Sequence, residues 1–279
     1  VHVLPRFTRD TTDRNRTSPF AFTGNKFEFR MLGSSNSIAD ANIMLNAAVA
    51  ESLRQYADVL EIASDFEGAL HEVIKNTVKE HKRIIFNGNG YDDTWIKEAT
   101  EKRGLLNLRT TPDAATALLE KKNIDMLSLH KVLSPVEIES RYETTLENYC
   151  KTVNIEALTM VDMAKKEILP AVEGYTGDLS KTLSAKLDAV SGLSCKYEKA
   201  TILKLSSLTD EIAEATSALE SSLIKMKTIS DITEESYFIR DVILQKMAEL
   251  RVVCDEAETL TAEKYWPFPT YSDLLFGVK

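Results

Sequence analysis

The sequence predicts an α+β protein in which helices predominate and strands are few and short. From residue 37 onward, apolar side chains recur at spacings of three and four, the period of helices that bury one face. Only Lys26–Arg30 alternates charged and apolar residues with the period of two that indicates a strand. The 279 residues, 43% of them hydrophobic, allow one or two domains with their own cores.

The first helix is predicted directly after a loop-rich start. Residues 1 to about 36 are rich in Arg, Thr, Phe, Gly, Ser and Asn, which is typical of loops around short strands. Ser37 can cap a helix whose N3 position is Asp40. That helix is expected to be buried, because it is strongly apolar at Ile43, Leu45, Ala47, Ala48, Val49 and Leu53.

Turn and start signals mark the helices that follow. A helix at about Asp65–Lys82 is expected to end before Asn87–Gly90, since Asn and Gly tolerate positive φ. A short helix follows at about Asp93–Lys102. Thr111 and Ser134 each precede a proline, the pattern of a capping residue with Pro at the first helical position.

Three long helices are predicted beyond residue 134, at about residues 135–169, 177–227 and 232–265. Pro170 is expected to interrupt the first, and Gly192 to break the second. Their apolar stripes predict an antiparallel bundle or a coiled-coil hairpin. The aromatic tail at Trp266–Tyr271 is expected to dock on a surface rather than extend into water.

Composition excludes several kinds of partner. A net charge of −9 and a pI near 5.2 argue against general binding to nucleic acid or to an anionic membrane. No apolar run approaches the length that spans a bilayer. The first ten residues do not form a secretory signal, and the chain lacks an initiator Met, so an incomplete or processed product is expected.

Cysteine and histidine spacing does not indicate a zinc site. The cysteines are scattered through helical sequence without a CxxC pair, which favours free thiols in a reducing, cytoplasmic compartment. The histidines are isolated from one another, so none is selected as a ligand or base. These residues are Cys150, Cys195, Cys254, His2, His71, His81 and His130.

The charged strand is the segment that carries candidate chemistry. Alternation places Lys26, Glu28 and Arg30 on one face and aromatic residues on the other. One interpretation is a solvated face on which Glu28 pairs with its neighbours. The other is the floor of a site, where a carboxylate holds a divalent metal and cations hold phosphate and carboxylate ligands. Arg16 lies in a polar loop upstream, where it can be exposed or can join such a site.

Two motifs in this region resemble those of a known enzyme family. Asn15–Ser18 followed by Lys26–Arg30 resembles the Asn-Arg-Ser and Arg-x-Glu-x-Arg motifs of glutamine synthetases. The whole run Asp13–Arg30 is similar to the large, type III members. Further similarity lies in Phe86–Tyr91, in Asn154–Met160 and in residues 266–276, so the resemblance extends over nearly the whole chain.

The resemblance implies a role for each site residue. Arg16 is expected to act catalytically on the γ-phosphate of ATP, and Lys26 to lie near the ATP phosphates. Glu28 is expected to ligate the divalent metal, Mg²⁺ or Mn²⁺, and Arg30 to bind the carboxylate of substrate glutamate. The implied reaction is ATP-dependent ligation of ammonia to glutamate through γ-glutamyl phosphate. The implied assembly is a ring-shaped homo-dodecamer.

The sequence also departs from the family pattern. Lys26 stands where shorter members carry Arg, which replaces a bidentate fork by a point charge, and Met31-Leu32 replaces their Pro-Asp. The family's other metal-binding glutamates would lie upstream, so the 279-residue chain alone is expected to be inactive. A helical interaction or scaffold module without catalytic activity is the alternative function.

The resemblance also predicts the domain organisation. Residues 1–150 are expected to form the end of a catalytic domain, and residues 151–279 a helical C-terminal extension. Residues 1–36 are expected to be poorly ordered in isolation, because strands without partners leave backbone groups unpaired.

Overall fold

The computed structural model describes residues 20–22, 27–30 and 37–277, and in these ranges the chain is predominantly helical, as predicted. The chain divides into two compact units. Unit 1 comprises Val1–Arg109 and Thr116–Glu139, and unit 2 comprises Thr110–Ala115 and Ser140–Lys279. The division into domains at residue 150 stays a prediction.

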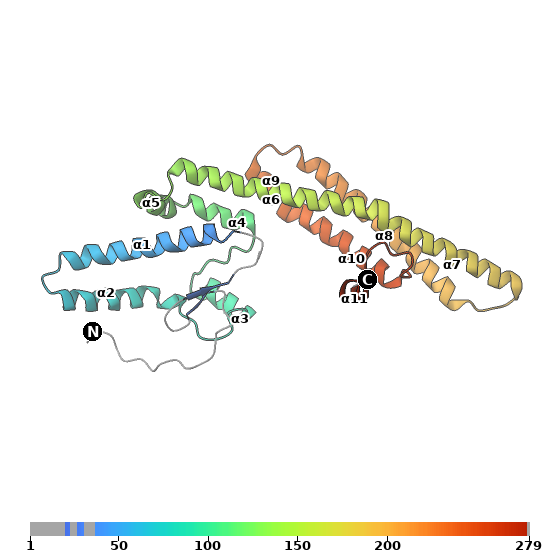
Figure 1. Cartoon of the computed structure of the whole chain (residues 1–279), viewed down its shortest axis with the longest axis horizontal. Coiled ribbons are helices and arrows are strands. Elements are labelled where there is room, and N and C mark those ends of the chain that lie inside the picture. Colours follow the sequence, from blue (N-terminus) through green and yellow to red (C-terminus); the bar gives the residue numbers. More distant parts are fainter. Residues whose placement is uncertain (1–19, 23–26, 31–36, 278–279) are drawn as a thin grey trace. The chain divides into compact units, whose positions relative to one another are not determined.

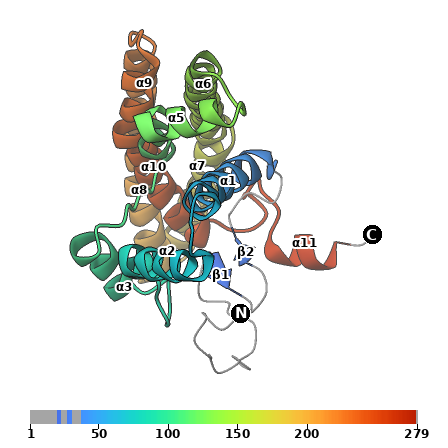
Figure 2. The ribbon, with the colours of Figure 1, turned by 90° about the vertical axis from the view of Figure 1, so that its left-hand side faces the viewer.

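Unit 1 combines a two-stranded sheet with short and medium helices. Strands β1 and β2 pair antiparallel, with Phe20 opposite Phe29. Helices α1 and α2 form an antiparallel hairpin, visible from two sides in Figures 1 and 2. The elements are β1 (Phe20–Phe22), β2 (Phe27–Phe29), α1 (Ala39–Glu61), α2 (Phe66–His81), η1 (Lys82–Ile84), α3 (Asp93–Lys97), the π-helical η2 (Glu98–Lys102), η3 (Thr116–Leu119) and α5 (Lys121–Leu129).

Local signals explain most of these boundaries. Asp65 caps α2, since its side chain accepts a hydrogen bond from the backbone N–H of Gly68. The Ser37 hydroxyl accepts from the N–H of Ala39 rather than from the N3 position that a capping box requires. The chain leaves the helical region before Asn87–Gly90, where Gly88 has a φ of 152°. The predicted break is therefore confirmed.

The expected burial of α1 is wrong for the described chain. Ala47 is its only buried residue, whereas Val49 and Leu53 are 58% and 61% exposed. The buried side of α1 packs through Ala47 and Met44 on a small cluster that includes Leu127. Apolar side chains of α1 such as Val49 and Leu53 therefore stay exposed within unit 1.

Unit 2 is a bundle of long helices. Helix α8 contacts both α7 and α10, as Figure 1 also shows. The elements are α4 (Thr111–Ala115), α6 (Pro135–Met163, which begins in unit 1), the π-helical η4 (Ala164–Ile168), α7 (Leu169–Ala189), α8 (Lys196–Met226), α9 (Ile232–Phe238), the π-helical η5 (Ile239–Ile243), α10 (Leu244–Leu260) and α11 (Tyr271–Phe276).

The helix does not end at Pro170, contrary to the prediction. It widens into a π-turn just before the proline, where the N–H of Leu169 donates to the carbonyl of Ala164. This places Pro170 at the start of a new α-helical stretch, where a missing N–H has no cost. The helix therefore continues to Ala189, and the predicted start at Gly177 is wrong. The predicted break near Gly192, which has a φ of 87°, is confirmed.

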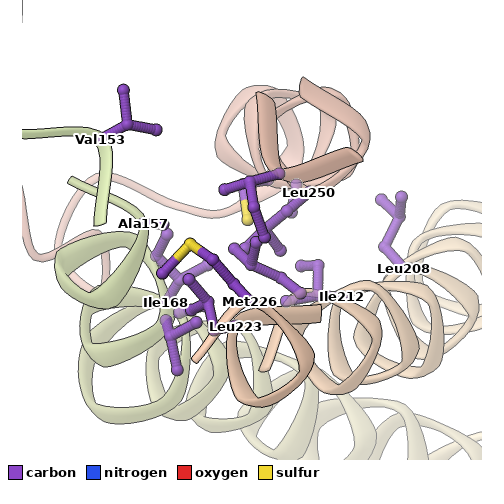
Figure 3. Packing of buried hydrophobic residues seen from close by; sticks show 14 of the residues in the cluster. Val153, Ala157, Ile168, Leu208, Ile212, Leu223, Met226 and Leu250 are labelled. Carbon is purple, nitrogen blue, oxygen red and sulfur yellow. The ribbon is translucent and has the colours of Figure 1, made fainter. Parts of the chain in front are cut away.

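The core of unit 2 forms along the predicted stripe of α8. Leu205, Leu208, Ile212 and Leu219 are fully buried. In Figure 3, side chains of α8 and Leu250 of α10 point toward one another within the same cluster as residues of α6 and η4. An ion pair between partly exposed side chains also joins Arg240 of η5 to Asp113 of α4 at 2.7 Å.

The aromatic tail docks on this core through Trp266 and Phe268, as predicted, whereas Tyr271 is 84% exposed, contrary to the prediction. Trp266 and Phe268 pack against the buried cluster with their rings edge to face, 6.0 Å apart. The hydroxyl of Tyr265 donates to the carboxylate of Asp178 on α7, which fixes the beginning of the tail. Among the described residues, no helix combines the length and the hydropathy that crossing a membrane requires.

Burial of the α8 stripe predicts a large effect for a truncation. Leu208→Ala should lower the free energy of unfolding by about 2–5 kcal/mol, because it leaves a cavity in a fully packed core. Leu203→Ala on the same helix is the matched control: Leu203 is 72% exposed, and its truncation should change stability by no more than about 0.5 kcal/mol. Urea unfolding followed by circular dichroism measures both. Equal losses would contradict the assignment of the core.

Candidate functional site

The candidate site begins with the pairing of β1 and β2. The register sets Glu28 opposite Ala21, and Phe27 opposite Phe22. Arg30 follows β2 directly, so Glu28 and Arg30 are alternate residues of one extended segment. Alternate side chains of a strand project to the same face, about 7 Å apart along the chain.

Glu28 and Arg30 form an ion pair on that face. The Nη2 atom of Arg30 donates to Oε2 of Glu28 at 2.8 Å. Their side chains are 29% exposed for Arg30 and 20% for Glu28, whereas Phe29 between them is 49% exposed. The structure therefore brings these two predicted site residues together in a half-buried position. Arg16 and Lys26 lie outside the described residues.

The described chain does not contain a complete metal centre. It has no group of three or more His, Cys, Asp or Glu side chains that could hold a metal ion. Glu28 can supply one or two oxygen ligands, whereas Mg²⁺ requires six. Glu28 alone could therefore fill only part of such a coordination shell.

A second polar cluster joins α1 to the end of α5. The carboxylate of Glu51 accepts hydrogen bonds from Arg54 at 2.8 and 2.9 Å and from Gln55 at 2.7 Å. Nε2 of His130 lies 2.9 Å from the same carboxylate. These contacts, that of Arg54 foremost, hold the pKa of Glu51 far below its usual range. A shallow groove of about 560 Å³ lies beside the cluster, between α1 and residues 130–132.

A stacked cluster anchors the Asn-Gly loop. The rings of Phe86 and Trp95 are stacked at 3.8 Å, and the guanidinium of Arg103 lies 4.7 Å from the Trp95 ring centre. Arg103 also donates to the backbone carbonyls of Arg83 and Ile85 and to the carboxylate of Glu98. This one side chain therefore closes the segment from residue 83 to residue 103. Asn87 and Asn89 of this loop are exposed.

Comparisons with known proteins support the resemblance. Residues 69–186 match the family described as Glutamine synthetase C-terminal domain. A protein named "Glutamine synthetase" from Butyrivibrio fibrisolvens is 38% identical, and the match covers 98% of this chain and 39% of that protein. A "Type-3 glutamine synthetase" from Dictyostelium discoideum is 37% identical over 98% of this chain and 38% of its own length. The chain is similar to glutamine synthetases over nearly its whole length.

The family match covers a smaller part of the chain than the matches to the relatives do. The glutamine synthetase C-terminal domain match runs from α2 to α7, so it includes the Asn-Gly loop and excludes the strand with Glu28 and Arg30. The chain spans about two fifths of the length of the curated relatives that it matches. A "Glutamine synthetase" from Bacteroides fragilis is 30% identical over the same share of the chain.

Sequence reasoning missed the His130 cluster for a specific reason. Glu51, Arg54, Gln55 and Asp58 lie three or four residues apart, a spacing that predicts pairing on one helix face. His130 is 79 residues further along the chain, and only the fold brings it to Glu51. Helix spacing could have identified half of the cluster. The other half depends on the packing of α5 against α1.

The depressed pKa of Glu51 predicts a pH-dependent contribution to stability. A carboxyl with a lowered folded-state pKa stabilises the fold above its unfolded pKa of about 4.3, and this contribution declines as pH falls below that value. Glu51→Gln should therefore destabilise the chain most near neutral pH, and the difference from wild type should shrink under acid conditions. Unfolding curves from pH 7 to pH 3 measure it. Glu61→Gln, at an exposed position on the same helix, is the control, and a difference independent of pH would contradict the account.

Proposed function

We propose that this chain is the C-terminal part of a type III glutamine synthetase that ligates ammonia to glutamate at the expense of ATP. In that reaction, the side-chain carboxylate of glutamate is phosphorylated to γ-glutamyl phosphate, and ammonia then displaces phosphate to give glutamine. The observation that carries the proposal is the charged face of β2, with Glu28 and Arg30 side by side, in a chain 38% identical to a named glutamine synthetase. ATP, glutamate and ammonia are the proposed substrates.

Each candidate residue has a proposed task in phosphoryl transfer. The transferred phosphoryl group carries developing negative charge, so catalysis depends on cations and positioning. Arg16 is proposed to act on the γ-phosphate, and Lys26 to hold ATP phosphates as a point charge. Glu28 is proposed as one ligand of Mg²⁺ or Mn²⁺, which neutralises phosphate charge when bound. Arg30 is proposed to bind the substrate's carboxylate.

The ion pair suggests how Glu28 and Arg30 divide these tasks. Each charge now neutralises the other across 2.8 Å. We propose that ligand contacts replace this bond, so that the guanidinium of Arg30 turns to the carboxylate of glutamate. A guanidinium suits this task, because its planar donors match a carboxylate in bidentate fashion. Glu28 is then released to face a cation.

The chain alone is proposed to be inactive. Within the described residues Glu28 has no group of further metal-binding side chains around it, and a catalytic centre needs more ligands. The relatives are longer than the chain by a factor of more than two, since it covers 39% and 38% of their lengths. The active enzyme is proposed to be a cytoplasmic homo-oligomer, a dodecamer. The alternative, a helical scaffold module, has no support from the comparisons.

Arg30→Ala in the full-length synthetase tests the substrate assignment. Loss of a charge-assisted hydrogen bond costs about 1.5–3 kcal/mol, so the KM for glutamate should rise roughly 10- to 100-fold, with a much smaller change in the KM for ATP. Arg251→Ala is the matched control, because Arg251 is 73% exposed on α10 and pairs with Asp255. Initial rates with either substrate varied provide both constants.

An unchanged KM for glutamate in Arg30→Ala would remove the assignment. Glu28→Ala in the same enzyme should abolish most turnover while the oligomer remains assembled, which size-exclusion chromatography checks. Full turnover in that variant would contradict the proposed function as a whole.

A further inference from the structure

Helix α1 has an apolar face that the described chain leaves uncovered. At about 100° per residue, Ile38 at the helix start, Val49 and Leu53 lie within roughly 60° of arc around the helix. Their exposed fractions are 67%, 58% and 61%. We call these three residues the outer stripe. Leu45, Tyr56 and Leu60 fall on the same side by the same spacing, but they are partly buried and do not belong to the outer stripe.

The charged residues of α1 lie on the opposite side. By the same geometry they project roughly 140–220° around the helix from Ile38, on either side of the direction of Ala47, which is 4% exposed. These residues are Asp40, Glu51, Arg54, Asp58 and Glu61. On this side Ala47 is buried and Glu51 is 18% exposed, whereas Asp40, Asp58 and Glu61 are exposed. Only part of the charged side therefore packs within unit 1, and the outer stripe does not.

Specific contacts fix this orientation. Glu51 bonds to His130 of unit 1 at 2.9 Å and to Arg54 on its own helix, and Arg54 also bonds to Asp58. Ala47 packs in a cluster with Leu127, Leu133 and Ile138. A rotation of α1 that buried the outer stripe would break these contacts. The stripe is therefore a surface of the unit, and an uncharged apolar surface of this kind marks an interaction site.

Two observations indicate what covers it. The chain spans about two fifths of its relatives' length, so a longer polypeptide of this family has ample chain to supply a cover. The sheet that precedes α1 in the sequence has two strands in the described residues, and two strands alone are marginally stable. The outer stripe and this two-stranded sheet both fall between residues 20 and 61.

We propose that the outer stripe of α1 is the docking surface for an apolar, uncharged face of the synthetase polypeptide that precedes residue 1. This inference rests on the proposed function, in that it takes the chain to be part of a longer glutamine synthetase. Because the stripe carries no charge, the contact is hydrophobic and independent of ionic strength. It lies within one polypeptide, so it is also independent of protein concentration.

Thiol labelling tests this contact directly. Leu53→Cys is introduced into the 279-residue chain and into the longer polypeptide of the same reading frame, both with Cys195→Ser. The remaining thiols, Cys150 and Cys254, are buried, which raises the pKa of each to about 11 and makes them slow to react. Leu203→Cys in α8 is the matched control, since Leu203 is also well exposed. Ile38→Cys is a second probe of the stripe.

The expected result is fast labelling of Leu53→Cys and of Ile38→Cys in the 279-residue chain. In the longer polypeptide, labelling at Leu53→Cys and Ile38→Cys should slow by about tenfold or more, at every protein concentration. Equal rates in the two polypeptides would overturn the inference. So would protection that grows with the concentration of the 279-residue chain alone, since a second copy would then be the occupant.

The readout separates this inference from the proposed function. Turnover is measured on the longer polypeptide without the introduced cysteines. An active synthetase with an unprotected stripe would refute the docking surface alone, whereas a protected stripe in a polypeptide without ligase activity would refute the proposed function alone.

Discussion

Burial of the apolar stripe of α8 between its neighbours holds unit 2 together. Leu205, Leu208, Ile212 and Leu219 are removed from water entirely, and helices α7 and α10 supply the surfaces that cover them. Unit 2 therefore has a core of its own, to which the aromatic tail adds Trp266. Unit 1 has no comparable core within the described residues, and its longest helix presents aliphatic side chains to solvent.

The three- and four-residue spacing of apolar side chains predicted the long helices of unit 2 well, because these helices bury their apolar face and expose their polar face. The stripe of α8 was visible at spacings of three and four, and Gly192 marked its boundary. The predicted helix end at Pro170 was wrong, because a π-turn just before the proline lets the helix continue. No residue type in the sequence indicates such a turn. The burial of α1 could not be predicted from composition. An apolar helix is buried only if its cover is present, and here the buried residue of α1 is Ala47, on the side where Glu51 contacts His130.

The candidate site was predicted in part. Alternation placed Glu28 and Arg30 on one face, and the structure joins them in an ion pair, as the more modest interpretation of a self-paired face also requires. A binding role for this face is our proposal, and it rests on the resemblance of the face to the substrate and metal motifs of glutamine synthetases. Within the described residues, no group of side chains completes a metal site around Glu28. The His130 cluster needed the fold, since its partners are far apart in sequence.

Hydrogen exchange on the 279-residue chain tests the central claim most directly, namely that unit 2 has a packed core of its own whereas α1 and β2 lack a comparable one within the described residues. The account predicts that amides between Leu205 and Leu223 of α8 exchange at least about 100-fold more slowly than those of α1 and β2. Protection of Val49, Leu53 and Glu28 as strong as that of the α8 core would contradict it.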